Sequence, residues 1–280
     1  MVLLAITAFI AGCGGDEKAS TDSGAQAEPA ATSGADGRSQ VIQQVSRSLA
    51  AVTALPKGER RTAAKGAPHS HGSGVVYDRS GLVLTSNHFV EDVGSLEVII
   101  NGRTFQGRAV ARAQCNDLAI VKLRPRPTGL QPIKMAADDA AQPGGEAVAI
   151  GYLRPPGSPA PQLISTTGAL AAVNVPGQIH PDLPQVESLV LHQAPLQPAM
   201  SGGALVNERG EMVGISTLLD PGKDGAGGTF QAVSVAQVRK LLGQLQETEG
   251  AVFGGWEDQH KCHGAMAKLT KSDYKAHASH

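Results

Sequence analysis

Residues 72–90 read GSGVVYDRSGLVLTSNHFV, in which two short runs of β-favouring residues stand on either side of a turn. The same alternation of a short apolar run and a turn continues to about Thr229. Further runs of this kind are LEVII, AIVKL, AVAIGY, LVLH and EMVGIST. Short strands at this spacing are typical of a β-sandwich or a β-barrel and not of βαβ units. The sequence therefore predicts an all-β domain.

Two helices are expected at the borders of this repeat. On the N-terminal side, apolar residues recur at helical spacing and predict a short amphipathic helix. These residues are Val41, Val45, Leu49 and Val52. On the C-terminal side, Ser234 stands three residues before Gln237, which is the spacing of a capping box. One face of the closing helix that follows is apolar and consists of Val235, Val238, Leu241, Leu242 and Leu245.

The composition agrees with a folded, β-rich chain. Hydrophobic residues make up 41% and charged residues 18% of the 280 residues, which is ordinary for a globular core. The 34 glycines and 17 prolines suit many short strands joined by turns better than a helical bundle. The net charge is −1 and no long basic run is present, so the sequence lacks the electrostatic footprint of a nucleic-acid-binding protein.

The N-terminus carries the pattern of an export signal. Residues 1–12, MVLLAITAFIAG, are apolar and uncharged but too short to span a bilayer, which is typical of a signal peptide. Ile10-Ala11-Gly12-Cys13 resembles a bacterial lipobox, which predicts lipidation of Cys13 and anchoring of the exported chain to a membrane of the bacterial cell envelope. The alternative is a plain signal peptide with an incidental cysteine. The apolar run lacks a preceding Lys or Arg, which departs from the usual pattern.

The chain is expected to divide into four parts. Residues 1–12 form the signal peptide, and residues 13–38 are polar and small and predict a flexible spacer. Residues 39–249 form the folded domain. Residues 250–280 are too few to fold as a second domain. They are expected to form a tail that either docks on the domain through Trp256 or is disordered.

Three segments carry residues suited to nucleophilic catalysis. His88 ends the apolar run quoted above, Asp117 precedes the apolar run in CNDLAIVKL (115–123), and Ser201 is followed by two glycines in PAMSGGALVNERGEMVGIS (198–216). A serine hydroxyl is a weak nucleophile and needs a base within hydrogen-bond reach. An imidazole can take that proton, and a buried carboxylate fixes its tautomer. The order His, Asp, Ser is that of the chymotrypsin arrangement and requires no metal or cofactor.

Residues 72–245 resemble the trypsin-like protease domain of the high-temperature-requirement (HtrA/Deg) branch. The matching segments are 72–76, 85–88, 116–121, 201–207 and 230–238. The resemblance implies two six-stranded antiparallel β-barrels with His88 as general base, Asp117 as the group that orients it and Ser201 as nucleophile. It further implies an extracytoplasmic serine endopeptidase that acts on unfolded or exposed polypeptide segments.

The chain departs from this family at the position two before the serine, where Ala199 replaces the usual glycine. By resemblance, the backbone N–H groups of Ala199 and Ser201 form the oxyanion hole. A residue with a Cβ is strained there by about 1–2 kcal/mol or leaves the peptide flipped. Losing one oxyanion donor costs about 10²–10³ in rate. The alternative function is therefore a weak or inactive protease-fold lipoprotein that acts as a peptide-binding or chaperone-like module.

By resemblance, the segments 192–198 and 214–218 wall the primary substrate pocket. Pro195, Leu196 and Thr217 offer no carboxylate in these segments, so small or medium apolar side chains are the expected substrates and not Lys or Arg. Relatives in this branch often carry PDZ domains, whereas only residues 250–280 follow the predicted closing helix. The sequence leaves the oligomeric state open.

The remaining cysteines and histidines give weaker signals. Cys115 and Cys262 can form one disulfide in an oxidising compartment or remain two free thiols. His260, Cys262 and His263 are crowded into four positions, a weak metal-binding pattern, and no metal site is predicted. An unrelated serine esterase is disfavoured because the chain order is wrong and no strand-elbow-helix follows Ser201.

Overall fold

The computed structural model describes residues 35–55, 70–91, 93–155, 158, 160–219 and 225–247. The predicted signal peptide, the lipidation site at Cys13 and residues 250–280 lie outside these ranges. No helix among the described residues is long and apolar enough to cross a membrane.

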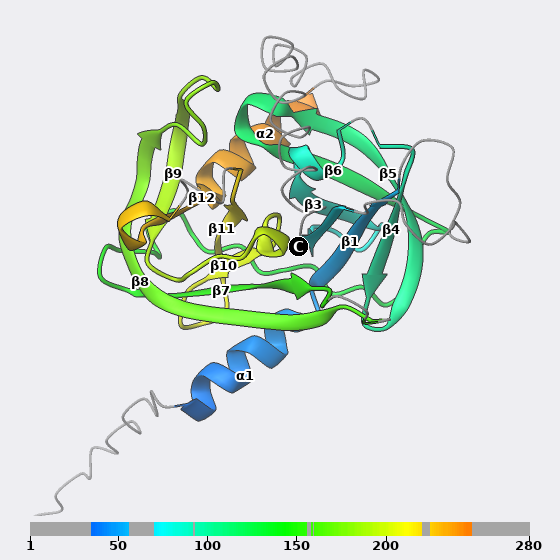
Figure 1. The fold of residues 1–280 in the computed structure, drawn as a ribbon, viewed down its shortest axis with the longest axis horizontal. Coiled ribbons are helices and arrows are strands. Elements are labelled where there is room, and N and C mark those ends of the chain that lie inside the picture. Colours follow the sequence, from blue (N-terminus) through cyan, green and yellow to red (C-terminus); the bar gives the residue numbers. More distant parts are fainter. Residues whose placement is uncertain are drawn as a thin grey trace, which may run out of the picture.

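Two closed antiparallel barrels of six strands each lie side by side (Figure 1). The first barrel has the strand order β1-β2-β3-β6-β5-β4. Its strands are β1 (Leu49–Leu55), β2 (Ser70–Val76), β3 (Leu82–Ser86), β4 (Ser95–Ile100), β5 (Arg103–Ala113) and β6 (Leu118–Arg124). The second barrel has the order β10-β11-β12-β9-β8-β7. Its strands are β7 (Glu146–Leu153), β8 (Gln162–Gly177), β9 (Val186–His192), β10 (Ala204–Val206), β11 (Met212–Thr217) and β12 (Phe230–Ser234). The predicted double barrel is confirmed.

The helices among the described residues are short. The α-helices are α1 (Ala35–Ser46) and α2 (Val235–Glu247), and the 3₁₀ turns are η1 (Asn87–Phe89), η2 (Gln114–Asn116), η3 (Pro198–Met200) and η4 (Ala226–Gly228). Helix α2 begins where the sequence predicts, because the Ser234 hydroxyl accepts a hydrogen bond from the Gln237 N–H at 3.1 Å. Three of these four 3₁₀ turns flank or contain the residues of the predicted triad.

The N-terminal helix differs from the prediction at both ends. It begins at Ala35, inside the predicted spacer, and ends at Ser46, so Leu49 and Val52 lie in β1. Every position of β1 from Leu49 to Ala54 is buried, so the strand lacks the alternating polarity that would distinguish it from a helix. A short apolar run of this kind fits both periods, and pairing of β1 with β2 and β4 decides the outcome.

Strands of the first barrel that face the second barrel are buried on both sides. In β2, Val76 belongs to the core of the first barrel, whereas Val75 belongs to a cluster that includes Ile150 and Ile215 of the second barrel. Neighbouring residues of a strand point to opposite faces, so such a strand needs apolar residues at successive positions. Burial on both faces explains why GVV in β2 and LVL in β3 are continuous apolar runs.

A pH dependence of stability follows from His192 at the end of β9. Its side chain is fully buried and its ring packs against Phe230 with the ring centroids 6.1 Å apart. Burial lowers the pKa of His192 from 6.5 to about 4, and neither ring nitrogen has a hydrogen-bond partner among the described residues.

Because the folded pKa lies below the unfolded one, the unfolded state takes up a proton first as the pH falls. We therefore expect the free energy of unfolding to fall between pH 6.5 and pH 4 by up to roughly 3 kcal/mol on this account. Urea unfolding across this range, in the wild type and in His192→Leu, measures the contribution. An equally steep loss in the variant would contradict it.

Candidate active site

His88 lies in η1, directly after β3, and its side chain is almost fully buried. Cross-strand pairing of Ser86 with Leu118 brings the end of β3 beside the start of β6, where Asp117 stands. The Asn87 N–H donates to the Asp117 carbonyl at 3.1 Å, so the two turns are also joined through their backbones. The register of one strand pair thus sets the distance between the predicted base and its carboxylate.

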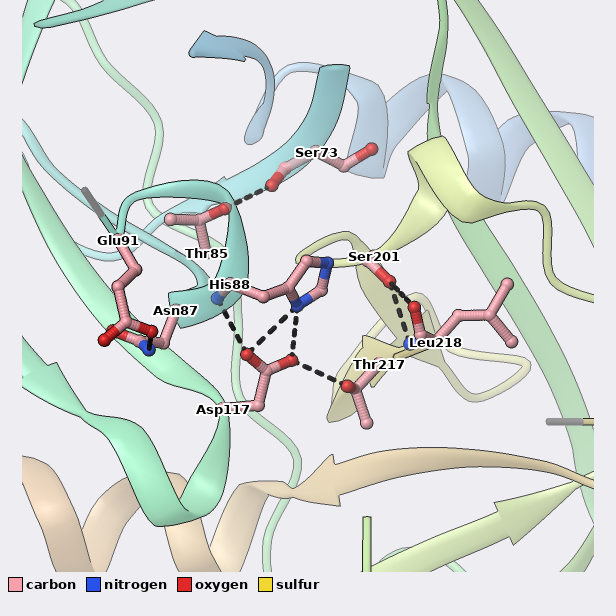
Figure 2. A network of polar contacts seen from close by, with 9 residues as sticks. All are labelled: Ser73, Thr85, Asn87, His88, Glu91, Asp117, Ser201, Thr217 and Leu218. Carbon is pink, nitrogen blue, oxygen red and sulfur yellow. Dashed lines mark hydrogen bonds and ion pairs between the residues drawn. The ribbon is translucent and has the colours of Figure 1, made fainter. Parts of the chain in front are cut away.

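The Asp117 carboxylate is surrounded by donors from both barrels (Figure 2). Its Oδ1 accepts from the His88 backbone N–H at 2.9 Å, and its two oxygens lie 3.0 and 2.9 Å from His88 Nδ1. Its Oδ2 also accepts from the Thr217 hydroxyl at 2.8 Å. Because an ionised carboxylate only accepts, Nδ1 carries the proton, and the lone pair of the neutral ring is left on Nε2.

Thr217 has a partner that the sequence did not predict. The side chain is buried and its hydroxyl donates to Asp117, and its expected place at the wall of the substrate pocket stays a prediction. The two residues are 100 positions apart in the chain, so no local pattern indicates the contact. The hydroxyl of Thr217 therefore helps to hold the carboxylate that orients the imidazole.

Ser201 follows η3 and is fully buried. In Figure 2 the imidazole of His88 lies between Asp117 and Ser201. Within the described part of the chain, both hydrogen-bond partners of the Ser201 hydroxyl are backbone atoms of Leu218: Oγ accepts from its N–H at 2.8 Å and donates to its carbonyl at 3.4 Å. A hydroxyl has one proton, so the Ser201 O–H must point to His88 instead of the Leu218 carbonyl before it can give that proton to the imidazole, while Oγ can still accept from the Leu218 N–H.

The predicted oxyanion hole is closed in this conformation. Pro198–Met200 form a 3₁₀ turn in which the Ser201 N–H donates to the Pro198 carbonyl at 3.1 Å. Ala199 has no positive φ; among the described residues other than glycine, only Asn101, Asp117 and Asn174 do. One of the two predicted oxyanion donors is therefore occupied by the chain itself. This contact is compatible with the flipped peptide that the sequence left open at Ala199, which stays a prediction.

The other predicted pocket residues lie on the loop before η3. Pro195 is exposed, and its carbonyl accepts from the Thr166 hydroxyl at 2.6 Å. Leu196 is buried in a cluster of the second barrel that also contains Val213 and Leu218. Their role in substrate binding stays a prediction.

A buried acidic residue braces the two turns that carry His88 and Asp117. Glu91 is 1% exposed and accepts from Asn87 Nδ2 at 3.3 Å and from Gln114 Nε2 at 3.2 Å. Asn87 belongs to η1 and Gln114 to η2, so the carboxylate links these turns. Figure 2 shows Glu91 beside Asn87, on the side away from the imidazole of His88. The sequence pattern gave no signal for this role of Glu91.

The hairpin after Ser201 is fixed by an ionic cluster. Glu211 accepts from Lys134 Nζ at 2.7 Å, from Asn207 Nδ2 at 3.2 Å and from Arg209 Nε at 3.0 Å. The hydrogen bond from Lys134 is the largest of several effects that lower the pKa of Glu211 to about 2. Glu211 therefore stays ionised near neutral pH and holds the turn between β10 and β11 closed.

The structure bears on the remaining predictions only in part. Cys115 is disulfide-bonded, so the alternative of two free thiols is wrong. Cys13 and Cys262 lie outside the described residues. His260 and His263 lie outside them as well. Within the described ranges, no group of three or more His, Cys, Asp or Glu side chains is placed to hold a metal ion.

Comparison with known proteins agrees with this geometry. A family model of the trypsin-like peptidase domain matches residues 72–215, the range that contains His88, Asp117 and Ser201. The chain belongs to the trypsin-like peptidase family. Within that family, its curated relatives place it in the HtrA branch.

Two relatives and one structure illustrate the match. The putative serine protease HhoA of Synechocystis sp. is 33% identical over 196 residues, 68% of this chain and 45% of HhoA. The periplasmic serine endoprotease DegP of Escherichia coli is 32% identical over 178 residues, 63% of this chain and 36% of DegP. The chain thus spans less than half the length of either relative. The structure of the HtrA-type protease AlgW with a tripeptide has a TM-score of 0.61 at 22% identity, covering 75% of this chain and 63% of AlgW, and supports the fold.

The close packing around Gly202 gives a test of the nucleophile segment. Gly202 has φ +81°, and a Cβ there would lie 2.2 Å from the Ser73 carbonyl oxygen and 2.7 Å from Thr85 Oγ1. We expect Gly202→Ala to lower the free energy of unfolding by more than the roughly 1–2 kcal/mol that the backbone conformation alone costs, because the backbone must move. Chemical denaturation measures the difference.

Gly129→Ala is the matched control. Gly129 has φ +75°, but a Cβ there has no atom within 4 Å, so this variant carries the backbone strain without the collision. If both variants lose the same stability, the proposed tight packing of the nucleophile segment is wrong.

Proposed function

We propose that the chain is an exported serine endopeptidase that hydrolyses peptide bonds in unfolded or exposed protein segments. The observation that carries the proposal is the continuous set of contacts from Thr217 through Asp117 to His88, with Ser201 on the other side of the imidazole (Figure 2). The Asp117 carboxylate accepts the hydrogen bond from the proton on His88 Nδ1. Nε2 is therefore the only atom of the imidazole ring that can act as a base.

The reaction follows from these positions. Ser201 Oγ attacks the substrate carbonyl while His88 Nε2 takes its proton, and Asp117 stabilises the imidazolium that forms. The imidazolium then protonates the leaving amine, which departs and leaves an acyl group on Ser201. A water molecule, deprotonated by His88, attacks this ester and releases the second product. General acid–base catalysis of this kind contributes about 10²–10⁴ in rate.

The proposed enzyme rests in a closed state and opens on substrate binding. The Ser201 O–H must point to His88 instead of the Leu218 carbonyl, and the Pro198–Ala199 peptide must turn so that the Ala199 N–H faces the oxyanion and the Ser201 N–H is released. Substrate favours the open state only through contacts that the closed state lacks. Such contacts are the hydrogen bonds from the two N–H groups to the substrate oxyanion.

The substrates and location follow from the relatives and the sequence. The relative from Escherichia coli is described as a periplasmic endoprotease, which supports polypeptide substrates outside the cytoplasm. Pro195 and Leu196 add no charge to the loop before η3, which supports apolar side chains at the primary site. We further propose residues 1–12 as signal peptide, lipidation at Cys13 as the membrane anchor, a spacer that ends where helix α1 begins at Ala35, and a protease domain that extends to residue 249.

A second function is favoured by the closed oxyanion hole. A chain in which Ser201 stays bonded to Leu218 and Pro198 would bind peptides without cleaving them, as a chaperone-like module does. The two functions differ in whether Ser201 reacts.

The first prediction of the proposal is covalent labelling of Ser201. The exported domain should react with a fluorophosphonate probe, and the label should be absent in Ser201→Ala, because only an activated serine attacks the phosphorus. Gel fluorescence measures the labelling, and degradation of unfolded casein measures peptide hydrolysis. A folded wild-type sample that remains unlabelled in the presence of unfolded casein would favour the binding module.

A second prediction concerns Ala199. The open oxyanion hole strains an alanine by about 1–2 kcal/mol, so Ala199→Gly should raise the rate of labelling by roughly 5–30-fold. The matched control is Ala136→Gly, a buried loop alanine that lies outside the predicted hole and outside the predicted pocket segments. Equal labelling rates for both variants would show that Ala199 does not hold the site closed.

A further inference from the structure

Ser73 lies on β2 of the first barrel, is fully buried, and has no part in the reaction described above. Its side chain bridges to the second barrel: the Ser73 hydroxyl donates to the Ala199 carbonyl at 2.7 Å and accepts from the Tyr152 N–H at 2.8 Å. A hydroxyl that is both donor and acceptor to buried backbone groups satisfies two groups that would otherwise be costly to bury.

The backbone of Ser73 continues this bridge in both directions. Its N–H donates to the Ser201 carbonyl at 2.9 Å, and its carbonyl accepts from the Thr85 hydroxyl at 2.6 Å. Thr85 stands in β3, three residues before His88, and Figure 2 shows its contact with Ser73 above the imidazole. Ser73 is therefore joined by hydrogen bonds to the strand that leads to the base and to the segment that carries the nucleophile.

The surroundings of Ser73 leave little freedom. A Cβ on Gly151 would lie 2.7 Å from Ser73 Oγ, and a Cβ on Gly202 would lie 2.2 Å from the Ser73 carbonyl oxygen. Glycine at both positions lets the backbone approach Ser73 closely. Small displacements of Ser73 are thus transmitted to the residues on either side.

We propose that Ser73 is a positioning residue that sets the nucleophile segment in register with His88. The Ala199 carbonyl belongs to the Ala199–Met200 peptide, and opening of the oxyanion hole turns the preceding Pro198–Ala199 peptide. By holding the Ala199 carbonyl, Ser73 fixes the point about which that peptide turns. The inference rests on the proposed function, because it concerns the same Ser201 and the same oxyanion hole.

The first arm of the test is kinetic. In Ser73→Ala, kcat on an unfolded substrate should fall about 10–100-fold, because a displacement of about 1 Å at a reacting group has an effect of this size. KM should change by less than about threefold, because Ser73 is buried behind the loop and does not face substrate. The matched control is Ser86→Ala: Ser86 is equally buried, and its hydroxyl has no hydrogen-bond partner among the described residues.

The second arm does not depend on activity. Hydrogen exchange at the N–H groups of Met200, Ser201 and Gly203, which all bond within the nucleophile segment, should be at least about 10-fold faster in Ser73→Ala. The N–H groups of β12 should exchange as in the wild type. A purely structural role for Ser73 would instead accelerate exchange across the barrel.

The outcomes separate the two proposals. If the wild type resists the fluorophosphonate probe, the proposed function fails and hydrogen exchange alone decides the role of Ser73. If the wild type is active, a kcat of Ser73→Ala equal to that of Ser86→Ala, or unchanged exchange in the nucleophile segment, overturns the inference. If Ser73→Ala does not fold, Thr85→Val breaks the bridge from the other end and should lower kcat with KM retained; an unchanged kcat would overturn the inference.

Discussion

A carboxylate that is shielded from water has to be met by donors, and in this chain those donors come from both barrels. Asp117 is fully buried, and its oxygens accept from His88 in the first barrel and Thr217 in the second. Burying an ionised group without such partners costs several kcal/mol. The two barrels therefore have to meet where these donors converge, and the imidazole is oriented as a result of the same contacts. Catalytic geometry and the barrel interface are consequently one arrangement and not two.

The sequence predicts the parts of this arrangement that depend on local pattern. Val75 and Val83 lie in short apolar runs bounded by turns, and these runs form strands of a closed barrel as expected. Leu49 and Val52 were assigned to the wrong kind of element, because a fully buried strand carries no period-two signal. The polarity of the side chains does not distinguish a helix from a strand in this segment. The pairing of β1 with β2 and β4 makes it a strand.

The parts of the candidate site that escaped prediction depend on long-range contacts. Thr217 and Asp117 are 100 positions apart, and Ser73 and Ala199 are 126 positions apart. No local sequence pattern predicts hydrogen bonds between residues so far apart in the chain. Ala199 was predicted in part. The sequence shows that alanine replaces the usual glycine, but only the fold shows the 3₁₀ turn and the hydrogen bond from the Ser201 N–H to the Pro198 carbonyl. The resemblance to a family predicts the three triad residues, whereas the conformation of the site depends on contacts that are present only in the folded chain.

The double burial of the central strands has a consequence for how such a chain can be recombined. Val75 packs with residues of the second barrel while its neighbour Val76 packs inside the first. A chimera that takes one barrel from a relative keeps the inner packing of that barrel but mismatches the outer face of its strands. Because protein interiors are close-packed, such a mismatch leaves voids or overlaps at the interface between the two barrels, where Asp117 lies. The two barrels are thus matched to each other, despite each being closed on itself.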